Sequence, residues 1–466
     1  MATVIHQTSQ GPTSVAASTT LYINLAANAR LSGTVTAETN WQTTYRSAGT
    51  LSNLYINILT NDRAASTLRT RVNVGNGNMN VSITGSTTGK FEDTVNTDSV
   101  TAADEWNYSL ATGAGGTVFT FSTVMTLFAA TTNTVSRIGA SLETSYTTAS
   151  TTFIGPLAGD LQLVASAADS LNGVTYRTAG SLANLFINIK NNARTTTSTL
   201  RSRVNSANGN LVISILSGVT GFLEDTANSD TLSSGNLINY SLTTGTGTES
   251  MSVAGVSADF TTTNNQAMYT AASGAGQVVN AGVTTYAHLS GSLRFNTTES
   301  NMILETNLAF TASLLQCNIS ANTIVLDSTL TLRKNSGVAN QTVTITAETT
   351  GIFQDTVNTD SILASDTLNY QIVTPSTLTA ITIRSISMLG DPNVTFAASP
   401  LTMTGVLATA GFLVNKLIDA LSILSNLVSS NPVVSVASNP LTLSASVTSI
   451  TPKVTKSIDA FDLVFT

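Results

Sequence analysis

A short loop rich in acidic and amide side chains occurs three times in the sequence, and its residue types could bind a cation. In the first copy, Asp93, Asn96 and Asp98 place side-chain oxygens at positions i, i+3 and i+5. Ca²⁺ takes six to eight oxygen ligands, so the loops are calcium candidates. The candidate ligands are Asp93, Asn96, Asp98, Asp225, Asn228, Asp230, Asp355, Asn358 and Asp360. We favour the alternative that these side chains bond their own backbone and fix a turn, because the EF-hand spacing and its bidentate Glu are missing.

An arginine and a tyrosine stand at fixed distances from each loop. The arginine precedes the first Asp of the loop by the same interval in all three copies, and the tyrosine follows that Asp by a second constant interval. These residues are Arg71, Arg203, Arg333, Tyr108, Tyr240 and Tyr370. We expect each arginine to pair with the acids of its loop across antiparallel strands, with a ligand or partner contact as the alternative. We expect each tyrosine to pack on a sheet with its hydroxyl at the edge, and sugar stacking is the alternative.

Catalytic chemistry has little material in this chain. His6 and His288 are the two histidines, and neither has a counterpart in the other copies. The sequence contains no Gly-x-Ser-x-Gly elbow and no His-Glu-x-x-His pair. Cys317 stands alone, so no disulfide forms within the chain, and we expect this thiol to be buried. We therefore predict no catalytic residue, no cofactor and no enzyme activity, although a glycosidase would need only two well-placed carboxylates.

The segments around these residues have the periodicity of strands. Residues 80–84 and 342–346 alternate polar and apolar side chains. This alternation predicts a sheet with one buried face. Asparagine–glycine turn signals separate the strand-like runs, and the run at 75–78 predicts a hairpin. Each copy is therefore expected to fold as a β-sandwich.

The loop recurs at nearly equal intervals along the chain, since its first acid is Asp93, then Asp225, then Asp355. The first two copies also share the triplet Thr-Tyr-Arg, at positions 44–46 and 175–177. We predict an all-β fold of three tandem jelly-roll-like β-sandwich modules with a short C-terminal helix and terminal strands. The expected divisions are an N-terminal arm (1–20), module 1 (21–155), module 2 (156–290), module 3 (291–405), and a C-terminal assembly or packing segment (406–466).

Leucines near the C-terminus recur at steps of three and four positions. They are Leu413, Leu417, Leu421, Leu424 and Leu427. This spacing predicts a helix with an apolar stripe, ended by Pro432. The stripe would pack against the third module or against another subunit. Strand-like residues beyond it, such as 461–465, could complete a neighbour's sheet.

Charge is scarce: 10% of the 466 residues are Asp, Glu, Lys or Arg, and the net charge is −7. Such a chain lacks the cationic surface that nucleic acids require, so no nucleic-acid partner is predicted. No run of about 18 apolar residues occurs, which predicts no membrane span. The first residues lack a basic region followed by an apolar one, which predicts no secretory signal.

The stretches 49–73, 180–205 and, more loosely, 314–335 each lead into one of the acidic loops. They resemble jelly-roll modules of bacteriophage virion and tail-fibre-like structural proteins, over most of each module but not at the chain ends. The resemblance implies a structural or host-contacting role. We therefore predict a self-assembling virion component (capsid-associated, decoration or fibre) that contacts itself, as a homo-oligomer or polymer, and other virion proteins. The alternatives are an extracellular filament subunit with strand exchange and a cell-surface adhesin module that binds a glycan or receptor.

Overall fold

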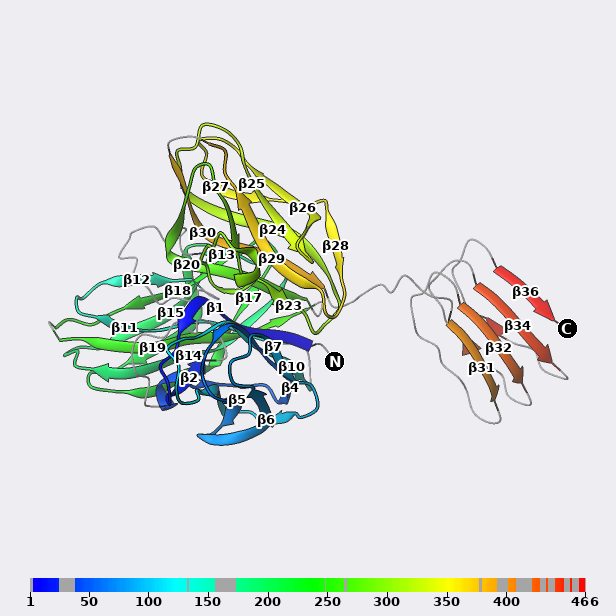
Figure 1. Cartoon of the computed structure of the whole chain (residues 1–466), viewed down its shortest axis with the longest axis horizontal. Coiled ribbons are helices and arrows are strands. Elements are labelled where there is room, and N and C mark those ends of the chain that lie inside the picture. The colour runs from blue at the N-terminus through cyan, green and yellow to red at the C-terminus, as the bar shows by residue number, and fades with distance from the viewer. Residues whose placement is uncertain are drawn as a thin grey trace. The chain divides into compact units, whose positions relative to one another are not determined.

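The computed structural model describes residues 3–24, 38–131, 134–155, 173–247, 249–263, 266–376 and 379–391, followed by strand residues 401–407, 421–427, 433–434, 441–447, 453–454 and 461–465. The chain forms two compact units, Met1–Pro392 and Asn393–Thr466. Regular structure in the described residues is almost entirely β-strand, which confirms the predicted all-β fold (Figure 1).

The first pair of sheets, module 1, lies between residues 3 and 130. Its strands are β1 (Thr3–Ser14), β2 (Thr20–Asn24), β3 (Thr43–Thr44), β4 (Gly49–Asn61), β5 (Ser66–Val72), β6 (Gly75–Ile83), β7 (Gly89–Asp93), β8 (Asp98–Val100), β9 (Glu105–Ala111) and β10 (Phe119–Ala130). One sheet has the order β1-β10-β4-β7, with β8 also on β4. The other has the order β2-β9-β5-β6, with β3 on β9. The short 3₁₀ helix η1 (Glu38–Trp41) precedes β3.

Two further pairs of sheets repeat this strand order. Module 2 contains β11 (Thr134–Tyr146), β12 (Thr151–Ile154), β13 (Val174–Thr175), β14 (Gly180–Asn192), β15 (Ser198–Val204), β16 (Ala207–Ile215), β17 (Gly221–Leu232), β18 (Leu237–Thr243) and β19 (Met251–Thr262). Module 3 contains β20 (Ala267–Asn280), β21 (Thr284–Ala287), β22 (Gly291–Ser292), η3 (Glu299–Asn301), β23 (Leu304–Glu305), β24 (Phe310–Asn322), β25 (Ser328–Lys334), β26 (Gly337–Ile345), β27 (Gly351–Gln354), β28 (Thr359–Ile362), β29 (Thr367–Val373) and β30 (Ala380–Asp391). Their sheets run β11-β19-β14-β17 with β12-β18-β15-β16, and β20-β30-β24-β27 with β21-β29-β25-β26.

Alternation of side chains gives each sheet a buried face. In β6, Met79, Val81 and Ile83 are buried, whereas Asn80 and Ser82 between them are not. The buried faces of the paired sheets meet in three hydrophobic clusters, one centred in each module. The alternation seen in the sequence therefore places the core correctly.

The hairpin between β5 and β6 turns slightly earlier than predicted. Asn73 and Val74 have φ of 47° and 60°, the pair of positive values of a type I′ turn. The glycines at 75 and 77, which suggested the turn, belong to β6 instead. The corresponding turns use Asn205 with Ser206, and Asn335 with Ser336.

Strand pairing also corrects the expected division of the chain. The predicted arm at 1–20 contains β1, which pairs antiparallel with β10 and so belongs to module 1. Strand β11, expected in module 1, pairs with β19 of module 2. Strand β20, expected in module 2, pairs with β30 of module 3. Each module therefore begins about one long strand earlier than the predicted boundaries 21, 156 and 291, because the repeated motifs lie in the middle of the module.

The C-terminal unit is a parallel sheet in the order β31 (Leu401–Leu407), β32 (Leu421–Leu427), β34 (Leu441–Val447) and β36 (Phe461–Phe465). Strands β33 (Val433–Val434) and β35 (Lys453–Val454) form a second parallel pair. The predicted helix is wrong over Leu421, Leu424 and Leu427, which lie in β32. Leu413 and Leu417 fall outside the described residues. The strand prediction at 461–465 is confirmed.

Successive strands of this sheet pair at one constant offset along the chain. Leu401 pairs with Leu421, Leu421 with Leu441, and Leu441 with Phe461. The sequence repeats with the same period, since valine occurs at 394, 414, 434 and 454. The strands therefore come from successive copies of one repeat, and this pairing is typical of a solenoid.

Candidate functional site

The acidic loops are held by hydrogen bonds to their own backbone and to the neighbouring strand β6. Asp93 Oδ1 accepts from the amides of Val95 and Asn96 at 3.1 and 3.0 Å, and Oδ2 accepts from the Asn80 amide at 2.8 Å. The Asn96 side-chain amide donates to Asp93 Oδ2 at 3.0 Å. Asp225 and Asp355 make the same set of bonds in modules 2 and 3.

The second acid of each loop is buried against the same strand. Asp98 accepts from the amides of Asn78 and Met79, at 2.5 and 3.4 Å, and from the Thr70 hydroxyl. A Cβ on Gly77 would lie 2.7 Å from Asp98 Oδ2, so the absence of a side chain there lets the carboxylate approach the strand. Asp230 and Asp360 accept from the matching amides of Asn210 and Asn340, at 2.6 and 2.8 Å.

These bonds set the charge state of the first acid. Desolvation raises the pKa of Asp93, but hydrogen bonds from the amides of Asn96 and Asn80 outweigh it, so the pKa lies below its usual range. The pKa values of Asp225 and Asp355 are lowered by the same balance. The three carboxylates are therefore charged acceptors for backbone N–H groups.

The geometry favours the turn interpretation of the loops over the calcium hypothesis. Both oxygens of Asp93 face N–H donors, and a cation would have to replace those bonds. Asn96 directs its amide nitrogen, not its oxygen, at Asp93. Within the part of the chain that the structure describes, no three His, Cys, Asp or Glu residues are grouped as a metal site would require.

The predicted pairing of the repeated arginines with the loop acids is wrong. Arg71 donates from Nε and Nη2 to Glu38 of η1, at 2.8 and 2.6 Å. Arg333 makes the corresponding pair with Glu299 of η3, at 3.0 and 3.1 Å. Arg203 bonds Asn208 and the Ser206 carbonyl, and its guanidinium lies 5.6 Å from the Phe153 ring centre. The arginines pair elsewhere because the loop acids are occupied by backbone amides.

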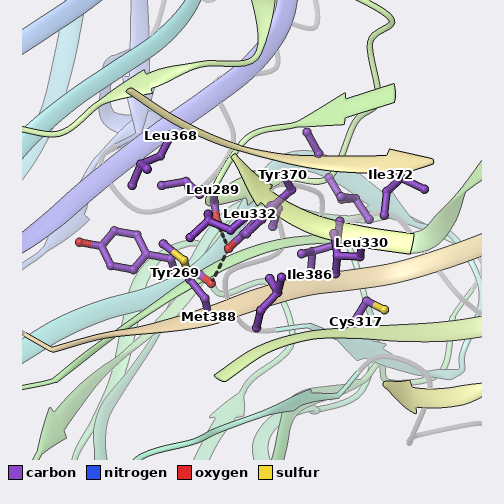
Figure 2. Close-up of a cluster of buried hydrophobic side chains, with 14 of the residues drawn as sticks. Tyr269, Leu289, Cys317, Leu330, Leu332, Leu368, Tyr370, Ile372, Ile386 and Met388 are labelled. Carbon is purple, nitrogen blue, oxygen red and sulfur yellow. Dashed lines mark hydrogen bonds between the residues drawn. The ribbon is translucent and has the colours of Figure 1, made fainter. Parts of the chain in front are cut away.

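The repeated tyrosines pack in the sandwiches, as predicted, but their hydroxyls are buried and do not lie at a sheet edge. The Tyr108 hydroxyl bonds Thr126 Oγ1 at 2.8 Å. Tyr370 lies among Leu330, Leu332 and other core side chains and donates to the Leu289 carbonyl at 3.3 Å (Figure 2). Tyr240 is likewise 0% exposed. No sugar can stack on these rings in the folded chain.

Two of the residues that might have supplied catalysis are buried. His288 is 1% exposed. Cys317 is buried in the module 3 core, as predicted, and burial raises the pKa of its thiol (Figure 2). His6 lies in β1, and the structure does not describe the side chains of this strand. None of the described helices is long and apolar enough to cross a membrane.

Two buried arginines that the sequence did not single out hold the loops at one end of modules 1 and 2. Arg63 donates to the carbonyls of Gly115 and Val15, at 2.7 and 3.1 Å. Arg194 donates to the carbonyls of Gly247 and Tyr146, at 2.7 and 2.5 Å. The sequence did contain a signal for these two arginines. Arg63 and Arg194 are separated by the same number of residues as the two Thr-Tyr-Arg triplets, so they occupy equivalent positions in the repeat.

Charged and amide side chains also form contacts where modules touch. Arg46 of module 1 forms an ion pair with Glu224 of module 2. Arg177 of module 2 donates to Gln316 of module 3 at 3.0 Å. Lys90 of module 1 donates to Glu305 of module 3 at 2.5 Å. These three contacts can join the modules to one another. In the sequence, only the Thr-Tyr-Arg triplet, which contains Arg46 and Arg177, pointed to them.

Comparison with known proteins gives no family. No family model and no curated protein matches the chain. Among solved structures, a xanthan lyase from Paenibacillus is similar at 12% identity, with a TM-score of 0.18. The match covers 74% of this chain and 34% of the lyase, so the chain spans about a third of that enzyme's length. A likeness at this level carries no argument about function.

Proposed function

We propose that this chain is a self-assembling structural protein of a bacteriophage virion. The observation that carries the proposal is the strand order found three times along one chain, β1-β10-β4-β7 facing β2-β9-β5-β6 and its two repeats. This is the double-sheet order of a jelly roll, an architecture that viral capsid proteins use. The fold connects this chain to capsid proteins by analogy.

The distribution of charge supports an assembling role. Several of the charged groups recur inside modules, as in Arg71–Glu38 and Arg333–Glu299, or lie between them, as in Arg46–Glu224. A surface poor in charge can be buried against other subunits without the cost of desolvating many ions.

Electron microscopy of the purified full chain, negatively stained over a rising concentration series, tests the proposal. Closed bodies or regular polymers are expected. A chain that stays a uniform monomer at the highest concentration would contradict self-assembly. A glycan array run in parallel addresses the adhesin alternative, and a specific hit together with a monomeric state would replace the structural role by a receptor-binding one.

A further inference from the structure

The three contacts between modules involve corresponding parts of each module. One side is the segment around β3, β13 or β23, which we call the docking segment. The other side is the sheet that contains β4, β14 or β24, which we call the receiving sheet. The docking segments supply Arg46, Arg177 and Glu305 to these contacts.

The direction of docking is the same each time. The docking segment of module 1 meets the receiving sheet of module 2, where Arg46 pairs with Glu224 of β17 and the side-chain Nδ2 of Asn188 in β14 donates to the Thr39 carbonyl at 3.0 Å. The docking segment of module 2 meets the receiving sheet of module 3, where Gln316 of β24 also donates to the Thr175 carbonyl at 2.8 Å.

The third contact joins the ends of the series. The docking segment of module 3 meets the receiving sheet of module 1, where Glu305 bonds Lys90 of β7. Tyr55 of β4 and Met125 of β10 join the hydrophobic cluster of module 3. Burial raises the pKa of Tyr55, and the carboxylate of Glu305 beside it raises it further. Lys90 and Glu305 are 215 residues apart, so nothing in the local chain imposes this contact.

Corresponding strands carry these contacts. Strands β4, β14 and β24 begin at residues 49, 180 and 310, so Tyr55, Phe186 and Gln316 occupy one position in the three modules. All three side chains are buried, at 2%, 1% and 4% exposure. Thr44, Thr175 and Glu305 likewise end the short strands β3, β13 and β23. A head-to-tail contact that is repeated in this way generates a ring if its rotation closes.

We propose that the three modules form a closed head-to-tail ring with approximate three-fold symmetry, so that one chain takes the place of a homotrimer. This inference goes beyond the proposed function and does not depend on it, because a ring can exist in a virion component, a filament subunit or an adhesin.

Each native contact joins opposite charges, or a charge and an amide.

Zero-length cross-linking of the full chain tests ring closure. A carbodiimide couples a lysine amine to a carboxylate in contact with it, and Lys90 lies 2.5 Å from Glu305 and 3.0 Å from Glu92. Mass spectrometry should find both the Lys90–Glu305 and the Lys90–Glu92 amide in the monomer band. In a mixture of isotopically light and heavy chains, the Lys90–Glu305 product should join light to light and heavy to heavy only.

Matched variants make the result specific. Glu305→Gln should abolish the long-range product and leave the Lys90–Glu92 product, which reports that the reagent still reaches Lys90. The double variant Lys90→Glu with Glu305→Lys should restore a product between the same two positions. The proposal is overturned if Lys90–Glu92 forms without Lys90–Glu305, or if light and heavy chains are joined in random proportion, which would place the contact between chains.

Discussion

The carboxylate of Asp93 shows how a repeated residue can look like a ligand and serve the backbone instead. It accepts hydrogen bonds from two amides of its own loop and from Asn80 of β6. Buried amides without an acceptor cost free energy, and a charged acceptor satisfies several of them at once. The same geometry in modules 2 and 3 indicates one structural solution used three times.

Replacement of Asp93 by alanine should destabilise the loop and the adjoining strands of module 1. The amides of Asn80, Val95 and Asn96 would lose their acceptor, at a cost of roughly 2–3 kcal/mol in the free energy of opening. Hydrogen exchange of peptides that cover β6 and β7 measures this loss. Glu348→Gln, which removes a charge from an exposed site, is the control. Unchanged exchange in β6 would contradict the role assigned to the carboxylate.

The lowered pKa values of Asp93, Asp225 and Asp355 predict loss of stability in acid. A carboxyl whose pKa is lower in the folded state than in the unfolded state stabilises the fold above the unfolded pKa, about 4, and this contribution disappears as the pH falls through the folded pKa. The melting temperature should therefore be level from about pH 6 to 5 and fall steeply below about pH 4. Scanning calorimetry over this range checks the prediction, and a melting temperature that does not change between pH 4 and 2.5 would be evidence against it.

At the residue scale, the sequence predicted which arginines are important but not which residues they pair with. The repeat correctly picked out Arg71 and Arg333 as special, but their partners Glu38 and Glu299 lie 33 and 34 residues earlier in a poorly repeated segment. Asp169 has the corresponding spacing from Arg203, although it lies outside the described residues. A search for acids at this spacing would have found the pairs.

At the scale of elements, strands with one buried face were predictable because alternation is local. Strand β32 of the C-terminal unit was mistaken for a helix. Leucines at steps of three and four positions also occur in strands when several short repeats follow one another. Comparing each repeat with the next aligns Leu401, Leu421, Leu441 and Phe461, which β31, β32, β34 and β36 place in register. The repeat period of the whole C-terminal segment distinguishes a parallel sheet from a helix, whereas the leucine spacing within one short stretch does not.

Deletion of one full repeat should preserve the parallel sheet. Removal of residues 421–440 would bring Leu401 opposite Leu441 with every later pair still in register, because each repeat contacts only its neighbours. Removal of residues 421–430 would shift the register by half a repeat. Hydrogen exchange in peptides covering 401–407 and 441–447 should stay slow in the first variant and become fast in the second. Equal protection in both variants would exclude the repeat as the basis of the sheet.

At the scale of the molecule, the sequence predicted repetition but not the contacts between repeats. Repetition is visible because the modules share residues, whereas the contacts depend on residues that differ, as Tyr55, Phe186 and Gln316 do at one position. Module boundaries were misplaced for a related reason: the first strands β1, β11 and β20 carry no shared motif. Only strand pairing assigns them to the modules that follow.

The side chain of Tyr55 should therefore affect the stability of two modules. It belongs to β4 of module 1 but packs in the hydrophobic cluster of module 3. Tyr55→Ala would leave a cavity there, with a cost of about 3 kcal/mol. Hydrogen exchange should become faster in β24 and β30 of module 3 as well as in β4. Leu51→Ala is the matched control, because Leu51 is equally buried in β4 but packs only in the core of module 1. If Tyr55→Ala and Leu51→Ala gave the same pattern, confined to module 1, the shared core and the ring that it closes would both be refuted.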